Sequence, residues 1–221
     1  MASDINKGSE YVILLHGLAR SAHSMDKMAA RLTEHGYKVL NIDYPSRSYP
    51  IEELAEQTIS DALKQCQGLP VNFVTHSMGG ILVRQFLSNH SIDNLNRVVM
   101  LGPPNQGTEI VDKLSHLPGF SFVNGEAGAQ LGTGALSLPN QLGKANFDVG
   151  VIAGTQSINL VLSSLIPSTD DGKVSVERTK VDGMNDHIEM PTTHVFMMRN
   201  DAVISQVIQY LQQGKFQHNA T

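Results

Sequence analysis

Short apolar runs alternate with amphipathic segments along most of this chain. In the amphipathic segments, apolar residues recur three and four positions apart, which predicts helices that bury one face. The apolar runs have the length of strands and fall at residues 11–15, 39–43, 71–74, 97–101, 147–154 and 188–191. Strands that alternate with helices indicate an α/β fold, with a mostly parallel sheet flanked by helices on both faces.

Residues typical of helix ends mark two of the boundaries. Gly36 follows a helical pattern that includes Met28 and Leu32, and glycine often ends a helix because it tolerates left-handed backbone. Asn200 precedes the last helical pattern, and Asp201 stands where the positive end of a helix favours an acidic side chain. We therefore expect the first helix to end near Gly36 and the last helix to begin near Asn200.

Length and composition fit a single domain. The 221 residues are enough for a substantial core, so residues 1–221 are predicted to form one unit. The chain has 16 basic and 21 acidic residues and no dense run of Lys and Arg, so no nucleic-acid partner is expected. Its one cysteine, Cys66, excludes an internal disulfide and a cysteine-only zinc site.

The apolar runs also bear on the location of the protein. None reaches the roughly 18 residues that a transmembrane helix needs, so no membrane span is predicted. Residues 1–8 are polar and lack the apolar stretch of a secretory signal. A cytoplasmic protein is the simplest interpretation, and a mature exported form, which would begin in the same way, stays open.

The apolar run at residues 71–74 is followed by Ser77, whose sequence context is typical of a catalytic nucleophile. Residues 75–80 read Thr-His-Ser-Met-Gly-Gly, and the glycines after Ser77 let a helix approach the strand closely. Such a strand-to-helix turn holds its serine in a strained backbone conformation, with the hydroxyl exposed at the end of the sheet. The alternative is an ordinary turn in which Ser77 caps the helix.

Two further polar segments follow Ser77 in an order that serine catalysis uses. A serine hydroxyl needs a base within hydrogen-bond reach, and the base needs an acid that orients it. Asp170 and Asp171 lie downstream of Ser77, and His194 lies between the last apolar run and the last helix. The order serine, acid, histidine is that of the α/β-hydrolase fold and differs from that of trypsin-like and subtilisin-like proteases.

With these residues in place, the chain resembles the bacterial lipase and esterase branch of the α/β-hydrolases. The matching segments are His16-Gly17-Leu18, residues 76–80, residues 101–108, Asp171-Gly172-Lys173-Val174 and His194. Their order and spacing carry the resemblance, which extends from about residue 11 to about residue 216. It implies an α/β-hydrolase fold and a serine carboxylic ester hydrolase, of lipase or esterase type, that works through an acyl-enzyme.

The resemblance assigns the catalytic roles. Ser77 is the implied nucleophile and His194 the implied base. Asp171 is the implied acid because the family's acid directly precedes the glycine of its turn, and Asp170 stays open as the rival.

The resemblance also places an oxyanion hole in the backbone. The N–H groups of Leu18 and Met78 would form it, and their side chains would shape the pocket. His16 would order the loop that carries Leu18. His76 would point away from the serine hydroxyl and would pack or hydrogen-bond locally. His187 would precede the last strand and face the wrong edge of the sheet.

Residues 103–146 interrupt the alternation of strands and helices. This stretch contains six glycines after Gly107, and an insert of this length is uncommon unless it is functional. By resemblance it would lie above Ser77 as a cap or lid, and the alternative is a set of short helices that complete the core. The chain departs from the family at Thr75, where glycine is usual, and at residues 103–105, which read Pro-Pro-Asn in place of Thr-Pro-His.

No cofactor and no metal are expected. The chain lacks the aspartate pair expected for the calcium of larger secreted lipases, and it lacks His and Cys at metal-ligand spacing. The implied substrate is a small-molecule or lipid ester, compatible with transient contact with a lipid surface, and the oligomeric state is open. Two other classes stay open: a thioesterase or acyltransferase with the same catalytic groups, and a non-catalytic binding module on this fold.

Overall fold

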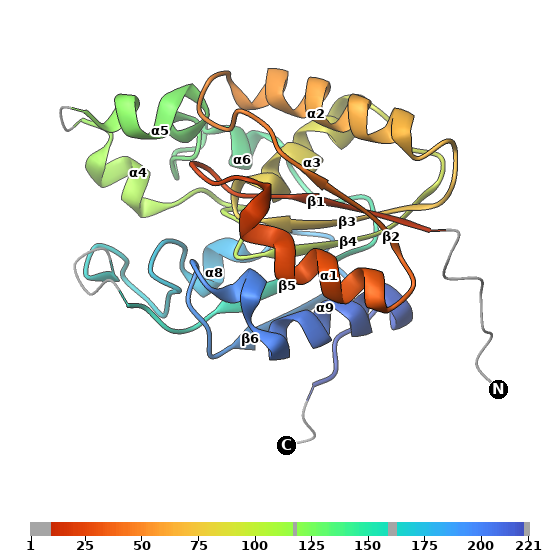
Figure 1. Cartoon of the computed structure of the whole chain (residues 1–221). Coiled ribbons are helices and arrows are strands. Elements are labelled where there is room, and N and C mark those ends of the chain that lie inside the picture. The colour runs from red at the N-terminus through yellow and green to blue at the C-terminus, as the bar shows by residue number, and fades with distance from the viewer. Residues whose placement is uncertain (1–9, 117–118, 159–162, 219–221) are drawn as a thin grey trace.

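A parallel sheet of six strands forms the centre of the described part of the protein (Figure 1). The computed structural model describes residues 10–116, 119–158 and 163–218. The strands lie in the order β2-β1-β3-β4-β5-β6, and each neighbouring pair is parallel. Their bounds are β1 Tyr11–Leu15, β2 Lys38–Ile42, β3 Val71–His76, β4 Leu95–Leu101, β5 Val149–Gly154 and β6 Asp186–Met190.

Helices cover both faces of this sheet, with α2 and α3 on one face and α1 and α9 on the other (Figure 1). Their bounds are α1 Asp26–Glu34, α2 Ile51–Gln65, α3 Met78–Asn89 and α9 Asp201–Gln213. The shorter helical segments are η2 Ala22–Met25, α4 Glu109–Leu114, α5 Phe120–Ala129, α6 Leu138–Gln141, α8 Val176–Thr179 and η3 Met197–Arg199. The predicted α/β fold is confirmed. Within the described ranges, no helix combines the length and apolarity needed to cross a bilayer.

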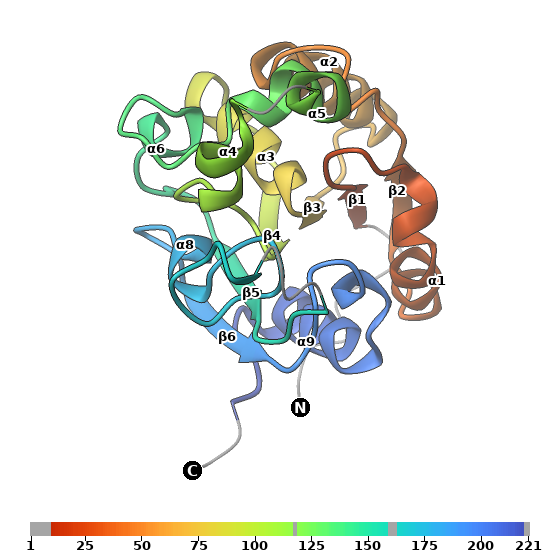
Figure 2. The same ribbon diagram turned by 90° about the vertical axis from the view of Figure 1, so that its left-hand side faces the viewer.

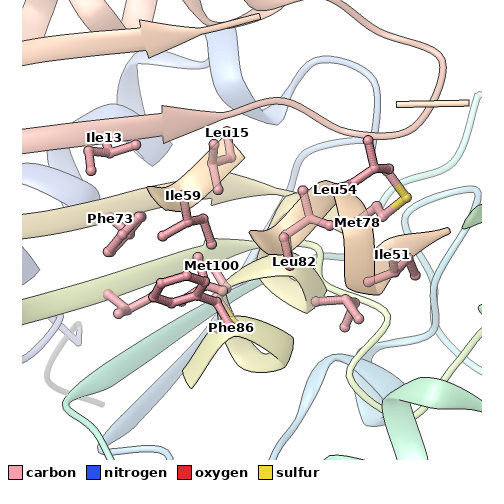
Figure 3. Packing of buried hydrophobic residues seen from close by; sticks show 14 of the residues in the cluster. Ile13, Leu15, Ile51, Leu54, Ile59, Phe73, Met78, Leu82, Phe86 and Met100 are labelled. Carbon is pink, nitrogen blue, oxygen red and sulfur yellow. The ribbon is translucent and has the colours of Figure 1, made fainter. Parts of the chain in front are cut away.

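The strand β3 shows why apolar runs form the centre of this sheet. All six of its residues are buried, because helices exclude water from both of its faces. Successive side chains of a strand point to opposite faces, so Phe73 packs against α2 and α3 whereas Val74 packs on the α1 and α9 side. Figure 3 shows Phe73 among the side chains of the first of these cores, with Met100 from β4 and Leu82 from α3.

The predicted helix ends are confirmed. Asn200 accepts hydrogen bonds from the backbone N–H groups of Ala202 (2.9 Å) and Val203 (3.4 Å), and it caps the N-terminus of α9. After α1 and its cap residue, Gly36 has a φ of 89°, the left-handed backbone that ends a helix. The last strand begins at Asp186, two residues before the expected start. Its polar first residues are tolerated because β6 lies at the edge of the sheet.

The insert at residues 103–146 folds into α4, α5 and α6, joined by loops, and residues 117–118 lie outside the described part. These helices gather at the end of the sheet where the strands finish (Figure 2). Four buried residues of the insert join the core on the α2 and α3 side, namely Val111, Ala127, Leu131 and Ala145. The insert thus completes this core, and it also walls the cavity described below.

The close packing of β5 against α9 leads to a stability prediction. A Cβ atom at Gly150 would lie 2.4 Å from the ring of Tyr210 and 2.8 Å from that of Phe216. The Tyr210 ring is held in place because its hydroxyl donates to Asp148 (2.6 Å). We expect Gly150→Ala to lower the free energy of unfolding in urea by about 1–3 kcal/mol through overpacking.

Gly134→Ala is the matched control for this prediction. No heavy atom lies within 4 Å of a Cβ placed at Gly134, so its free energy of unfolding should stay close to that of the unsubstituted chain. Equal losses from Gly134→Ala and Gly150→Ala would contradict the packing argument.

Candidate active site

Ser77 occupies the turn between β3 and α3 in a strained backbone conformation. Its φ is 53° and its ψ is -123°, a region that L-residues rarely adopt and that costs about 1–3 kcal/mol. Its N–H donates to the carbonyl oxygen of Leu101 (2.8 Å), which ties the turn to the end of β4. The Ser77 side chain makes no capping hydrogen bond to α3, so the interpretation as a helix cap is wrong.

Gly79 allows α3 to start directly behind this serine. A Cβ atom at Gly79 would lie 2.7 Å from the carbonyl oxygen of Leu15 and 3.0 Å from that of His16. The first turn of α3 therefore packs against the end of β1 at a distance that admits only glycine. This is the close approach that the glycines after Ser77 predicted.

His194 and Asp171 form a buried pair. His194 Nδ1 lies 2.7 Å from Asp171 Oδ2, and the His194 N–H donates to the Asp171 carbonyl oxygen (2.9 Å). Asp171 Oδ1 accepts from the backbone N–H groups of Lys173 (3.0 Å) and Val174 (2.9 Å). A carboxylate only accepts, so the neutral imidazole carries its proton on Nδ1 and leaves the Nε2 lone pair free.

Asp170 has other partners. Its Oδ1 accepts from the Gly172 N–H and its Oδ2 from the Ser163 hydroxyl, each at 2.6 Å. Of the two neighbouring carboxylates that the sequence left open, Asp171 is the one that contacts His194.

His76 packs against His194, and its hydrogen bond joins a distant segment in place of the local bond that was one of the two expected alternatives. Its Nε2–H donates to the carbonyl oxygen of His194 (2.9 Å), and the two ring centroids are 4.7 Å apart. Burial, and then the charge of His194, lowers the pKa of His76 well below its usual range. A neutral His76 with its proton on Nε2 adds no positive charge next to Ser77.

The loop that carries Leu18 is held by His16. The His16 Nδ1–H donates to the Gly17 carbonyl oxygen (2.9 Å), and His16 Nε2 accepts from the Tyr44 N–H (3.3 Å). The Tyr44 hydroxyl donates to the His16 carbonyl oxygen (2.5 Å), and its ring stacks on the imidazole with centroids 4.1 Å apart. Burial lowers the pKa of His16, which favours the neutral ring that these bonds require.

The two residues expected to supply the oxyanion hole differ in what their side chains do. Met78 is the first residue of α3, where backbone N–H groups lack a partner within the helix. Its side chain packs in the core (Figure 3), so the expectation that it shapes the pocket is wrong. The Leu18 side chain does line the pocket.

One cavity of about 230 Å³ brings these groups together at the end of the sheet. Ser77, His76 and His194 line its floor. The apolar walls come from the Leu18 loop and from the insert: Leu18, Ile110, Val111, Leu114 and Leu131. His187, by contrast, lies inside β6, contacts the Thr179 hydroxyl (3.2 Å) and does not line this cavity.

Three residues of this site were missed by sequence reasoning. Arg20 and Lys173 also line the cavity, and Gly102, with a φ of 52°, lies behind the buried pair. A Cβ atom at Gly102 would be 2.9 Å from Asp171 Oδ2 and 3.1 Å from His194 Nδ1. Arg20 and Lys173 could have been found from their neighbours in the sequence, because each lies two positions after a predicted site residue. Arg20 follows Leu18, and Lys173 follows Asp171.

No metal-binding cluster of three or more His, Cys, Asp or Glu side chains occurs in the ranges that the structure describes.

The chain belongs to the alpha/beta hydrolase family, whose model matches residues 12–156. A protein of Mycobacterium phage D29, named a non-heme haloperoxidase, is 34% identical over 86 residues, which is 36% of this chain and 31% of that protein. The chain thus spans about a third of the length of this relative.

Two solved structures share the fold over nearly the whole chain. The mature lipase BlEst2 of Bacillus licheniformis gives a TM-score of 0.74 at 18% identity, covering 95% of this chain and 94% of that one. The esterase EaEST of Exiguobacterium antarcticum gives 0.63 at 18% identity, covering 92% of each chain. The resemblance to the α/β-hydrolases, first recognised from short motifs, is confirmed.

The geometry of the buried pair predicts a spectroscopic signature. A ring N–H that donates to a buried carboxylate is strongly deshielded, so His194 should give a low-field proton resonance in the NMR spectrum. The Asp171→Asn variant should lose this resonance, and Asp170→Asn should keep it because Asp170 does not touch the imidazole. The opposite pattern would mean that Asp170 is the partner of His194 in solution.

Proposed function

We propose that this protein is a serine carboxylic ester hydrolase of the lipase or esterase type, with Ser77 as nucleophile. The observation that carries the proposal is that Ser77 and His194 line one cavity while His194 is bonded to the buried Asp171. Nucleophile, base and orienting acid are the groups that acyl transfer through serine requires.

In the proposed reaction, Ser77 Oγ attacks the carbonyl carbon of the ester and gives its proton to Nε2 of His194. Asp171 stabilises the imidazolium that forms, because its Oδ2 already accepts the Nδ1 proton. The imidazolium then protonates the leaving alcohol as the tetrahedral intermediate collapses to an acyl-enzyme. Water attacks the acyl-enzyme with His194 as base, which releases the acid and restores Ser77.

The negative charge of the tetrahedral intermediate is assigned to the backbone N–H groups of Leu18 and Met78. Met78 opens α3, so the positive end of the helix dipole adds to the stabilisation. Each oxyanion donor is worth about 3 kcal/mol of barrier in enzymes of this kind. The bonds of His16 and Tyr44 support this role because they hold the backbone just before Leu18.

The acyl group is assigned to the apolar part of the cavity. The cavity has a volume of about 230 Å³, and its apolar walls suit an acyl chain. Residues 103–146 act as the cap of the single domain at residues 1–221, since Ile110, Val111 and Leu131 belong to this insert.

Substitutions of Ser77 and Asp171 test the roles proposed for them as nucleophile and orienting acid. Ser77→Ala should lower the kcat for a p-nitrophenyl ester by about 10⁴-fold or more, because no other group replaces the nucleophile. Asp171→Asn should lower it by about 10⁴-fold, because the imidazole loses its tautomer and its counter-charge. Asp170→Asn serves as the matched control and should keep turnover close to that of the unsubstituted chain.

Turnover that survives in Ser77→Ala would refute the assigned nucleophile, and the reverse ranking of the two Asn variants would move the acid to Asp170. Product analysis with a competing alcohol identifies the acyl acceptor. Free acid as the main product supports a hydrolase, whereas the ester of the added alcohol would make the protein an acyltransferase.

A further inference from the structure

Two cationic side chains stand at the mouth of the cavity that holds Ser77. Arg20 follows the loop at the end of β1, and Lys173 follows the Asp171 turn. Both side chains are exposed and line the cavity, whereas the walls deeper inside, such as Val111 and Leu131, are buried and apolar. A positive mouth on a chain with a net charge of -5 is a local feature of this site.

Neither cation forms an ion pair within the part of the chain that the structure describes. The two carboxylates that precede Lys173 in its turn have other partners: Asp171 accepts from His194 and from two backbone N–H groups, and Asp170 accepts from Ser163 and Gly172. Asp171 therefore acts on Lys173 only through its charge, without forming an ion pair with it.

The two cations line the same cavity. Although the Lys173 residue as a whole stays exposed, partial desolvation of its ammonium group, and then the charge of Arg20, lowers its pKa, while the charge of Asp171 raises it. Both cations also lower the pKa of His76, which lies on the cavity floor. Two like charges that line one cavity, and that form no ion pair among the described residues, make a site that a bound anion would stabilise.

The cationic edge continues beyond the cavity. A neighbouring hollow of about 240 Å³ is lined by Arg20, Phe196 and Arg199. Arg199 is exposed and forms no ion pair among the described residues. Arg20 lines both cavities, so positive charge continues from the Ser77 cavity to Arg199 in the neighbouring hollow.

We propose that the ester substrate carries an anionic group, phosphate or carboxylate, on its alcohol part, and that Arg20 and Lys173 bind this group. The inference rests on the proposed ester hydrolase function. The apolar walls take the acyl chain, so the charged mouth faces the leaving alcohol. Arg20 and Lys173 are specificity-determining residues in this assignment.

Two esters with the same acyl chain and the same nitrophenolate chromophore test this assignment. One is neutral 4-nitrophenyl hexanoate, and the other is its anionic analogue 5-hexanoyloxy-2-nitrobenzoate. The kcat/KM ratio of the anionic to the neutral ester should fall by about tenfold in the Arg20→Gln, Lys173→Gln double variant. The same ratio should fall with added salt in the unsubstituted enzyme, because salt screens exposed charges.

Lys144→Gln is the matched control, since Lys144 is an exposed cation that does not line the cavity. The charge-conserving Arg20→Lys, Lys173→Arg variant should keep most of the preference for the anionic ester. A ratio that is unchanged in the double Gln variant, or that falls equally in Lys144→Gln, would overturn the inference.

Inhibition by inorganic phosphate tests whether the cationic side chains bind an anionic group on the ester or only a free anion. Competitive inhibition by phosphate that is lost in the double Gln variant, together with preference for the anionic ester, supports the inference. Inhibition without that preference would mean that the mouth binds free anions, and the inference would fall. If the unsubstituted enzyme turns over neither ester, the proposed function itself fails, whereas turnover without charge preference refutes only the anion site.

Discussion

The site depends on one strained residue that the sheet and a helix hold in place. Ser77 adopts left-handed backbone at the end of β3, which costs about 1–3 kcal/mol. The bond from its N–H to Leu101 ties it to β4, and Gly79 brings α3 against the carbonyl oxygen of Leu15. The apolar core between the sheet and α2 and α3, which includes the Met78 side chain, offsets that cost (Figure 3). The fold thus holds the serine hydroxyl where the cavity opens.

The same edge of the sheet gathers the other groups of the site. Parallel strands end on one side, so the segments after β1, β3, β4, β5 and β6 all meet there. His194 follows β6, and Asp171 lies in the segment between β5 and β6. A side-chain bond and a backbone bond join these two residues, and Gly102 after β4 leaves the space that their contact occupies. The positions of Ser77, His194 and Asp171 relative to one another therefore depend on the strand order as well as on the individual residues.

Local patterns predicted those parts of the molecule that local chemistry decides. The alternation of apolar runs and helical spacing predicted the sheet. The helix ends near Gly36 and Asn200 followed from the backbone freedom of glycine and the side-chain chemistry of asparagine. Contacts between distant segments were beyond such patterns. The bond between His76 and the carbonyl oxygen of His194 spans 118 positions, and the separate partners of Asp170 and Asp171 depend on how a whole turn folds. Adjacency to Leu18 and to Asp171 marks Arg20 and Lys173 one at a time, but the order of residues does not show that both side chains line one cavity.

Covalent labelling with a fluorophosphonate, followed by peptide mass mapping, reports whether Ser77 is an activated nucleophile. The reagent reacts with a serine hydroxyl that a neighbouring base activates. We expect a single adduct on Ser77 that forms far more slowly in Asp171→Asn, because His194 is then no longer held in its active tautomer. An adduct on another serine, or labelling of Ser77 at the same rate in Asp171→Asn, would show that Asp171 and His194 do not activate Ser77.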